Sequence, residues 1–172
     1  MFKQNFSDWQ AADADKVFYP KISHTWKFNG QIHKAEEVSN LESIWTKEKK
    51  KVQISMNLAT AEQRESFIRM FAIRNISPPS YKIDNLGDEG ILIKFHYRVE
   101  IAFTKENVVT HINYDYPSKY KKLVSFGSGQ MYDAPQVEVE FALKIARLIA
   151  AEIKGKQTIE TLTGVEKQQN NK

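Results

Sequence analysis

"GILIKFHYRVEIAFTKENVVTHINYDY", residues 90–116, decides the fold that the sequence predicts. From Ile91 to Phe103 every second residue is apolar or aromatic, which is the alternation of a strand with one buried face. This run is longer than most strands, so we expect a strongly twisted strand or one that bends near Lys94. The segment "TKEN", residues 104–107, then reverses the chain into a return strand. The sequence therefore predicts a long antiparallel hairpin.

Two further β segments come before this hairpin. The pair Asn29-Gly30 separates two β-prone runs, and because both positions of a tight type I′ turn need positive φ, it predicts a hairpin over about 22–38. The stretch "KVQISMNL", residues 51–58, alternates apolar and polar residues as a half-buried strand does. The chain is therefore rich in antiparallel β-structure.

A helix is predicted over about 60–74. Thr60 and Gln63 have the spacing of a capping box, in which each side chain accepts a hydrogen bond from the other residue's backbone N–H. The prolines of "SPPSY" forbid continuation of this helix. Its apolar stripe is expected to contain Phe67, Ile68, Met70 and Phe71.

A second helix is predicted over about 134–154. Asp133 is a suitable N-cap, Pro135 fits the first turn because it needs no N–H there, and Gly155 is a natural stop. Apolar residues at helical spacing predict a face that packs on the sheet. These residues are Phe141, Ile145, Leu148, Ile149 and Ile153, with Ala142 and Ala146 at the edge of the stripe.

The chain of 172 residues fits one domain. We expect an N-terminal arm over 1–19, anchored by one aromatic residue, Trp9 or Phe18, then a single domain over 20–155 and a loose tail over 156–172. The order of elements is that of an α+β fold, an antiparallel sheet flanked by two main helices in an α/β/α sandwich-like arrangement. Strands and helices do not alternate, which argues against a doubly wound nucleotide-binding fold.

Composition excludes several kinds of site. Without cysteine the chain has no disulfide, no thiol nucleophile and no zinc site of the cysteine-containing kinds. No stretch reaches the length of a transmembrane helix, and the N-terminus lacks the pattern of a signal peptide. The mature part of an exported protein would have the same appearance, so the residues alone leave the compartment open.

Polar side chains of the 95–116 hairpin form the candidate binding face. Two registers are possible. A turn at Glu106-Asn107 places Arg98 opposite Asp115, whereas a turn at Lys105-Glu106 places Glu100 opposite His111. Both pair sensible partners, so the face is either an ordinary solvated or partly covered surface of a sheet or a site. Its members are His96, Arg98, Glu100, His111, Asn113 and Asp115.

Two other functions remain as alternatives. An enzyme or metal-dependent protein would use the same face, but no pair of histidines has the spacing of a compact ligand set, so we predict no metal site, no catalytic residue and no cofactor. A binder of polyanions or nucleic acid would need two basic runs on one surface, and the net charge of only +4 disfavours it. The lysines of these runs are Lys47, Lys49, Lys50, Lys51, Lys119, Lys121 and Lys122.

Residues 85–153 show a resemblance to exported bacterial domains. In "NLGDEGILIKFHYRVEIAFTKENVVTHINYDY" a Gly-Asp-Glu turn leads into strands, and "VEVEFALKIARLIAAEI" supplies a closing amphipathic helix. This pattern resembles the α/β/α sandwiches of the PsbP and Mog type. The resemblance implies an extracytoplasmic, non-enzymatic module, and no catalytic residue of that family matches here.

From the residues and this resemblance together we expect a non-catalytic binding or interaction module. Its partner would be a protein or a small molecule, without nucleic acid. We expect an exported protein, periplasmic or extracellular, with a cytoplasmic location as the alternative. The sequence does not fix the identity of the ligand or the oligomeric state.

Overall fold

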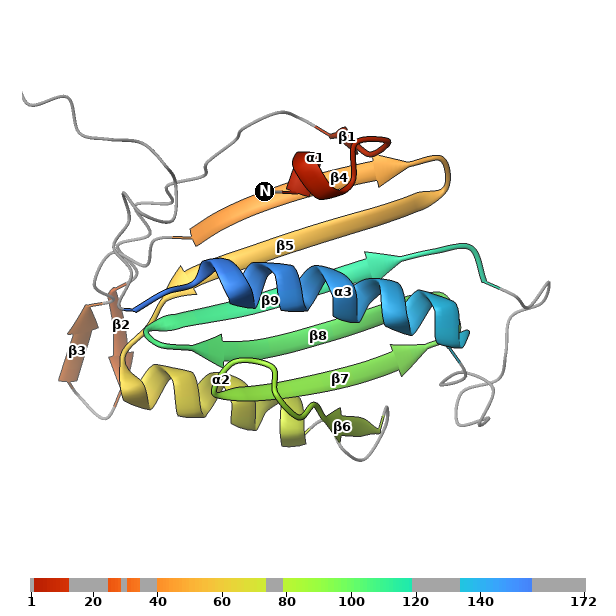
Figure 1. Ribbon diagram of the computed structural model, residues 1–172. Helices are drawn as coiled ribbons and strands as arrows, with labels where there is room; N and C mark the ends of the chain where they lie inside the picture. Colours follow the sequence, from red (N-terminus) through yellow and green to blue (C-terminus); the bar gives the residue numbers. More distant parts are fainter. Residues whose placement is uncertain are drawn as a thin grey trace, which may run out of the picture.

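The structure is a computed structural model that describes residues 2–12, 25–28, 31–34, 40–73, 79–118 and 134–155. Within these ranges it contains a seven-stranded antiparallel sheet, in the order β1-β4-β5-β9-β8-β7-β6, and a separate two-stranded hairpin, β2-β3 (Figure 1). The strands are β1 (Gln10–Ala11), β2 (Thr25–Phe28), β3 (Gln31–Lys34), β4 (Asn40–Lys47), β5 (Lys50–Leu58), β6 (Ser80–Lys82), β7 (Glu89–Phe95), β8 (Arg98–Lys105) and β9 (Val108–Asp115). The helices are α1 (Phe2–Asn5), α2 (Ala61–Ile73) and α3 (Gln136–Glu152).

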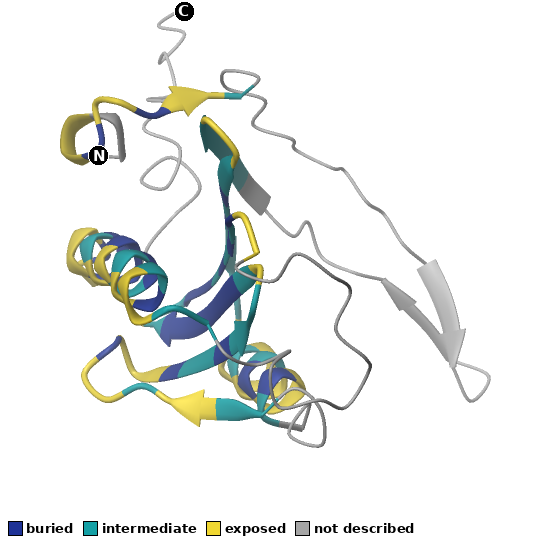
Figure 2. Ribbon diagram, turned by 90° about the vertical axis from the view of Figure 1, so that its right-hand side faces the viewer, coloured by how far each residue is buried: buried dark blue, intermediate teal, exposed yellow. Residues whose placement is uncertain are grey.

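The two long helices lie on opposite faces of the sheet (Figure 2). α3 packs on the face that contains Val99 and Ile101, which are fully buried in the main core. α2 packs on the other face, where Phe71 contacts a smaller cluster around Ile93 and Ala102. The predicted α+β fold, a sheet flanked by two main helices, is confirmed.

The start of α2 is the predicted capping box. The backbone N–H of Thr60 donates to Oε1 of Gln63 at 2.8 Å, and the backbone N–H of Gln63 donates to Oγ1 of Thr60 at 3.3 Å. The predicted stripe needs one correction, because Met70 is 57% exposed while Ile68 and Phe71 are buried. The buried stripe of α2 therefore centres on Ile68 and Phe71, and Met70 lies outside it.

The predicted face of α3 is confirmed for Ile145, Ile149 and Ile153, which are at most 2% exposed, and it is centred closer to the two alanines than the spacing predicted. Ala142 and Ala146 are completely buried, whereas Phe141 and Leu148 are only partly buried. Pro135 is the N-cap and precedes the first turn, and Asp133, the predicted cap, lies outside the described residues.

The predicted single strand from Ile91 to Phe103 is wrong, because it is two strands. β7 and β8 form a hairpin with a tight turn at His96-Tyr97, and Phe95 lies opposite Arg98. The two residues that flank such a turn, Phe95 and Arg98, lie opposite each other and point to the same face of the sheet. Every second residue counted from Ile91 therefore points to one face before the turn and to the other face after it. The apolar residues of β7 face α2, those of β8 face α3, and the alternation in the sequence runs through the turn unbroken. Neither turn residue has positive φ, so glycine is not needed.

Three strands were not predicted. β4 precedes the turn Glu48-Lys49, which lies within the first of the two basic runs. β6 and β1 are short edge strands that pair with β7 and β4 respectively. The predicted strand at 51–58 and the hairpin within 22–38 are confirmed as β5 and β2-β3, although Asn29-Gly30 lies outside the described residues.

The loop before β7 packs against the β8-β9 turn and depends on Gly87. The backbone N–H of Asp88 donates to the carbonyl oxygen of Thr104 at 2.7 Å, and the carboxylate of Asp88 accepts the N–H of Glu106 at 2.9 Å. Gly87 has a φ of +65°, and a Cβ on it would lie 2.2 Å from the Thr104 oxygen. Only glycine fits at this position.

We therefore expect Gly87→Ala to lower the free energy of unfolding by about 1–2 kcal/mol, because alanine must move the loop away and adopt a strained φ. Urea unfolding followed by circular dichroism measures the change. Gly155→Ala is the control, since Gly155 also has positive φ but has open space around its Cβ position. Equal losses for the two variants would contradict the close approach to Thr104.

Candidate functional site

The candidate binding face adopts the first of the two predicted registers. The β8-β9 turn is at Glu106-Asn107, so Arg98 lies opposite Asp115 and Glu100 opposite Asn113. Nε of Arg98 donates to Oδ1 of Asp115 at 2.5 Å. This hydrogen bond to Asp115 is the main cause that raises the pKa of the Arg98 guanidinium.

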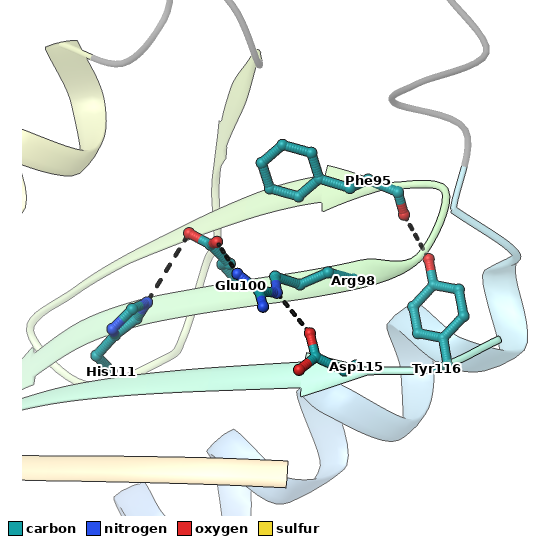
Figure 3. Close-up of polar contacts among 6 residues, drawn as sticks. All are labelled: Phe95, Arg98, Glu100, His111, Asp115 and Tyr116. Atoms are coloured by element: carbon teal, nitrogen blue, oxygen red, sulfur yellow. Dashed lines mark hydrogen bonds and ion pairs between the residues drawn. The ribbon is translucent and has the colours of Figure 1, made fainter. Parts of the chain in front are cut away.

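Glu100 joins this pair to a histidine. Its Oε1 lies 3.5 Å from Nη1 of Arg98, and its Oε2 lies 3.9 Å from Nε2 of His111 (Figure 3). Only 7% of Glu100 is exposed, so water contributes little to stabilising its carboxylate, and the neighbouring polar groups must do so. Asp115, Arg98, Glu100 and His111 thus form one polar chain across β9 and β8, which we call the ion-pair chain.

Helix α2 lies against one end of the ion-pair chain. The ring of Phe71 packs on His111 with centroids 4.8 Å apart. In the described part of the structure, Nε2 of His111 and Oδ1 of Asn113 are buried and make no hydrogen bond. The predicted face is therefore partly covered by α2 at this end.

The sixth residue of the predicted face, His96, is in the β7-β8 turn, where its ring meets the edge of Tyr97. Tyr116 supports this turn, because its hydroxyl donates to the carbonyl oxygen of Phe95 and its N–H donates to that of Tyr97 (Figure 3). Across the described ranges, no three His, Asp or Glu side chains are arranged as metal ligands.

The basic runs are partly neutralised. Lys47 forms a salt bridge with Asp8, and Lys50 forms one with Glu138. Lys49 is exposed in the β4-β5 turn, and Lys51 lies opposite Asp115 in the register of β5 and β9. The second run, Lys119, Lys121 and Lys122, lies outside the described residues, so a shared basic surface stays a prediction.

A cavity that sequence reasoning missed lies at one end of the sheet. It has a volume of about 340 Å³, and its lining residues come mainly from the N-terminal arm, the β4-β5 turn and the start of α3. Figure 1 shows where these elements lie. We call it the aromatic cavity. It is lined by Trp9, Lys47, Glu48, Lys50, Tyr114, Val137, Glu138 and Phe141.

Three aromatic rings form the walls of the aromatic cavity. Trp9 stacks on Phe141 with centroids 5.4 Å apart and an interplanar angle of 15°. Tyr114 packs against Phe141 at 4.9 Å and against Trp9 at 6.3 Å. Trp9 is only 5% exposed and anchors the arm as predicted, but Phe6, which was not predicted, is a second buried aromatic anchor at 7% exposure. Phe18, the other predicted anchor, lies outside the described residues.

A lysine, a carboxylate and a tyrosine meet at the same place. Nζ of Lys50 lies 2.9 Å and 3.0 Å from the two oxygens of Glu138, and the Tyr114 hydroxyl donates to Oε2 of Glu138. The ammonium also lies 5.9 Å from the centre of the Tyr114 ring. Burial, and secondly the hydrogen bond to Glu138, raise the pKa of the Tyr114 hydroxyl.

No spacing in the sequence links these residues. Of the three, the sequence analysis singles out only Lys50, as part of a basic run. They come together because β5 pairs with β9 and α3 packs across the same end of the sheet. A sequence signal for the aromatic cavity is therefore lacking.

The raised pKa of Tyr114 predicts a loss of stability at alkaline pH. The folded protein holds this proton more tightly than the unfolded chain does. The contribution of Tyr114 to the free energy of unfolding is therefore complete below about pH 10 and declines above that value. We expect the free energy of unfolding to fall less between pH 9 and 11, the range around that value, in Tyr114→Phe than in the wild type. Urea titrations measure this, with Tyr97→Phe, which replaces an exposed tyrosine, as the control. Parallel declines in the wild type and Tyr114→Phe would contradict the assignment.

Comparison of the chain with protein-family models, with curated proteins and with solved structures gave no match in any of the three. The resemblance to PsbP and Mog-type sandwiches and the exported location therefore stay predictions. Within the described ranges, no helix combines the length and the apolar composition needed to cross a membrane.

Proposed function

We propose that the protein is a non-catalytic binding module and that the aromatic cavity is its ligand site. The observation that supports this most strongly is the cavity itself. Its volume of about 340 Å³ lies in the range of small-molecule sites, which combine apolar and aromatic walls with a few polar groups that orient the ligand. Trp9, Tyr114 and Phe141 provide such walls, and Lys50 and Glu138 provide such polar groups.

The charged groups on the other face favour a structural role. Arg98 pairs with Asp115 and approaches Glu100, so these charges compensate one another within the sheet. A catalytic acid or base must reach a substrate, whereas Glu100 is 7% exposed. We accordingly expect no single acid or base of this face to be indispensable for function.

A fragment screen by NMR tests the proposal. A panel of small amines, carboxylates, sugars and nucleotides is titrated into ¹⁵N-labelled protein. We expect at least one compound class to shift the indole N–H of Trp9 and the backbone amides of Val137 and Glu138. Shifts confined to the residues around His111 and Asn113 would contradict the proposed location and favour the sheet face.

A blocked variant makes the screen specific. Val137 lines the aromatic cavity and is 67% exposed, so Val137→Trp is expected to fill its entrance without disturbing the core. Met70→Trp places the same side chain on an exposed position of α2, remote from the cavity lining. Binding should be lost in the first variant and kept in the second. Equal binding by both would contradict the proposed site.

A further inference from the structure

We propose that the aromatic cavity selects organic ammonium ions, that is, primary amines attached to a ring or a short apolar chain. We further infer that Lys50 is an internal competitor that occupies the ammonium position in the unliganded protein. This inference rests on the proposed function, because it names the ligand class of the same cavity.

Lys50 shows how an ammonium group is held there. Its Nζ lies within 3.0 Å of both oxygens of Glu138 and 5.9 Å from the centre of the Tyr114 ring. A carboxylate at hydrogen-bond distance beside an aromatic ring is the combination that recognises ammonium ions elsewhere. The Tyr114 hydroxyl also donates to Glu138, so this carboxylate keeps its orientation when the lysine leaves.

One carboxylate at the aromatic cavity has no ion pair within the described part of the chain, and it favours an approaching cation. Lys47 is paired with Asp8 and Lys50 with Glu138, which leaves Glu48 without an ion pair among the described residues. The lining residues carry two carboxylates, Glu48 and Glu138, and two ammonium groups, those of Lys47 and Lys50. Glu48 is exposed at the rim of the cavity, where it would attract an approaching cation.

The walls suit the apolar body of such an amine. Trp9 and Phe141 are stacked nearly parallel, and Val137 exposes its side chain at the entrance. A cavity of about 340 Å³ accommodates a ligand with a single ring. The ring would pack on the aromatic walls while its ammonium replaces that of Lys50 at Glu138.

The test uses three probes with the same ring and different charge: 2-phenylethylamine, 2-phenylethanol and phenylacetate. Their dissociation constants are measured by NMR titration at neutral pH for the wild type, Lys50→Ala, Lys51→Ala and Glu138→Gln. Lys51→Ala is the matched control, because it removes the same charge from the neighbouring position, whose side chain points to the other face of the sheet.

We expect the amine to bind the wild type more tightly than the alcohol or the acid does. Lys50→Ala should strengthen amine binding by about tenfold, the change expected when one charge-assisted hydrogen bond is freed for the ligand. Lys51→Ala should leave the affinity within about twofold of the wild type, and Glu138→Gln, which can still accept the Tyr114 bond, should abolish selection for the amine.

The failures are distinguishable. If phenylacetate binds best and Lys50→Ala weakens it, Lys50 is an anion receptor, so the ligand class is overturned while the binding function stands. If amine binding weakens in Lys50→Ala, or strengthens equally in Lys51→Ala, the competitor role is overturned. If no probe perturbs Trp9, Tyr114 or Phe141 in any variant while another class from the fragment panel does, only the ammonium inference fails. Silence from both the probes and the panel overturns the proposed function as well.

Discussion

Trp9→Ala is expected to lower the free energy of unfolding by about 3–5 kcal/mol, the usual cost of truncating a buried tryptophan. Trp9 is 5% exposed, stacks on Phe141 and donates its backbone N–H to the carbonyl oxygen of Phe6 at 3.0 Å. Its loss would leave the N-terminal arm attached mainly through Phe6, the short β1-β4 pairing and an exposed salt bridge. Such exposed pairs contribute little.

Chemical unfolding monitored by far-ultraviolet circular dichroism measures this loss. Val137→Ala is the matched control, because Val137 lines the same cavity but is 67% exposed, and it should cost less than about 0.5 kcal/mol. The same Trp9 variant should also lose ligand binding, because one wall of the aromatic cavity is gone. A loss of stability below about 1 kcal/mol would contradict a docked arm.

Arg98→Met is expected to cost about 3 kcal/mol at neutral pH. It leaves Glu100 as a buried carboxylate without its guanidinium and removes the 2.5 Å hydrogen bond to Asp115. Breaking a fully buried pair costs about 3–5 kcal/mol. The lower limit applies here because the Arg98 side chain is 34% exposed, and water partly compensates the charges that remain.

A second substitution separates this cause from a general loss of packing. Glu100→Gln removes the buried charge, so we expect the double variant Arg98→Met/Glu100→Gln to recover a large part of the stability that Arg98→Met loses. Unfolding in urea of the two single variants and the double variant completes the cycle. Strictly additive losses would show that Arg98 and Glu100 do not interact, which would contradict the ion-pair chain.

The sequence predicted those elements that depend on interactions between residues close together in the chain. The capping box of Thr60 and Gln63 works because both partners are within one helical turn. The sequence left two alternatives for the β8-β9 register, and the structure contains the one with the turn at Glu106-Asn107. Glu106 adopts a positive φ in this turn. The apolar face of α3 was predicted for Ile145, Ile149 and Ile153, whereas Phe141 and Leu148 are only partly buried.

The errors arise where a pattern has two explanations. Alternation from Ile91 to Phe103 fits one long strand and equally fits two strands joined at His96-Tyr97, because a two-residue turn exchanges the faces without breaking the alternation. No glycine, asparagine or aspartate marks that turn. Of the predicted polar face, Arg98, Glu100, His111 and Asp115 form the ion-pair chain. They meet because the register of β8 and β9 decides which side chains lie opposite one another.

The aromatic cavity could not be predicted because its residues come from the N-terminal arm, β4 and the turn after it, β5, β9 and α3. Trp9 arrives with the arm, Lys50 with β5, Tyr114 with β9 and Glu138 with α3, and each has an ordinary local explanation. Only the docking of the arm and of α3 at the same end of the sheet makes them neighbours. This arrangement is a property of tertiary structure alone.

Intermolecular nuclear Overhauser effects (NOEs) between 2-phenylethylamine and the Lys50→Ala variant test the central claim, ligand binding in the aromatic cavity, most directly. The account predicts NOEs from the ring protons of the amine to ring protons of Trp9, Tyr114 and Phe141. Contacts with His111 or Phe71 instead, on the opposite face of the sheet, would contradict it, as would a bound amine that shows no contact with any of the three cavity rings.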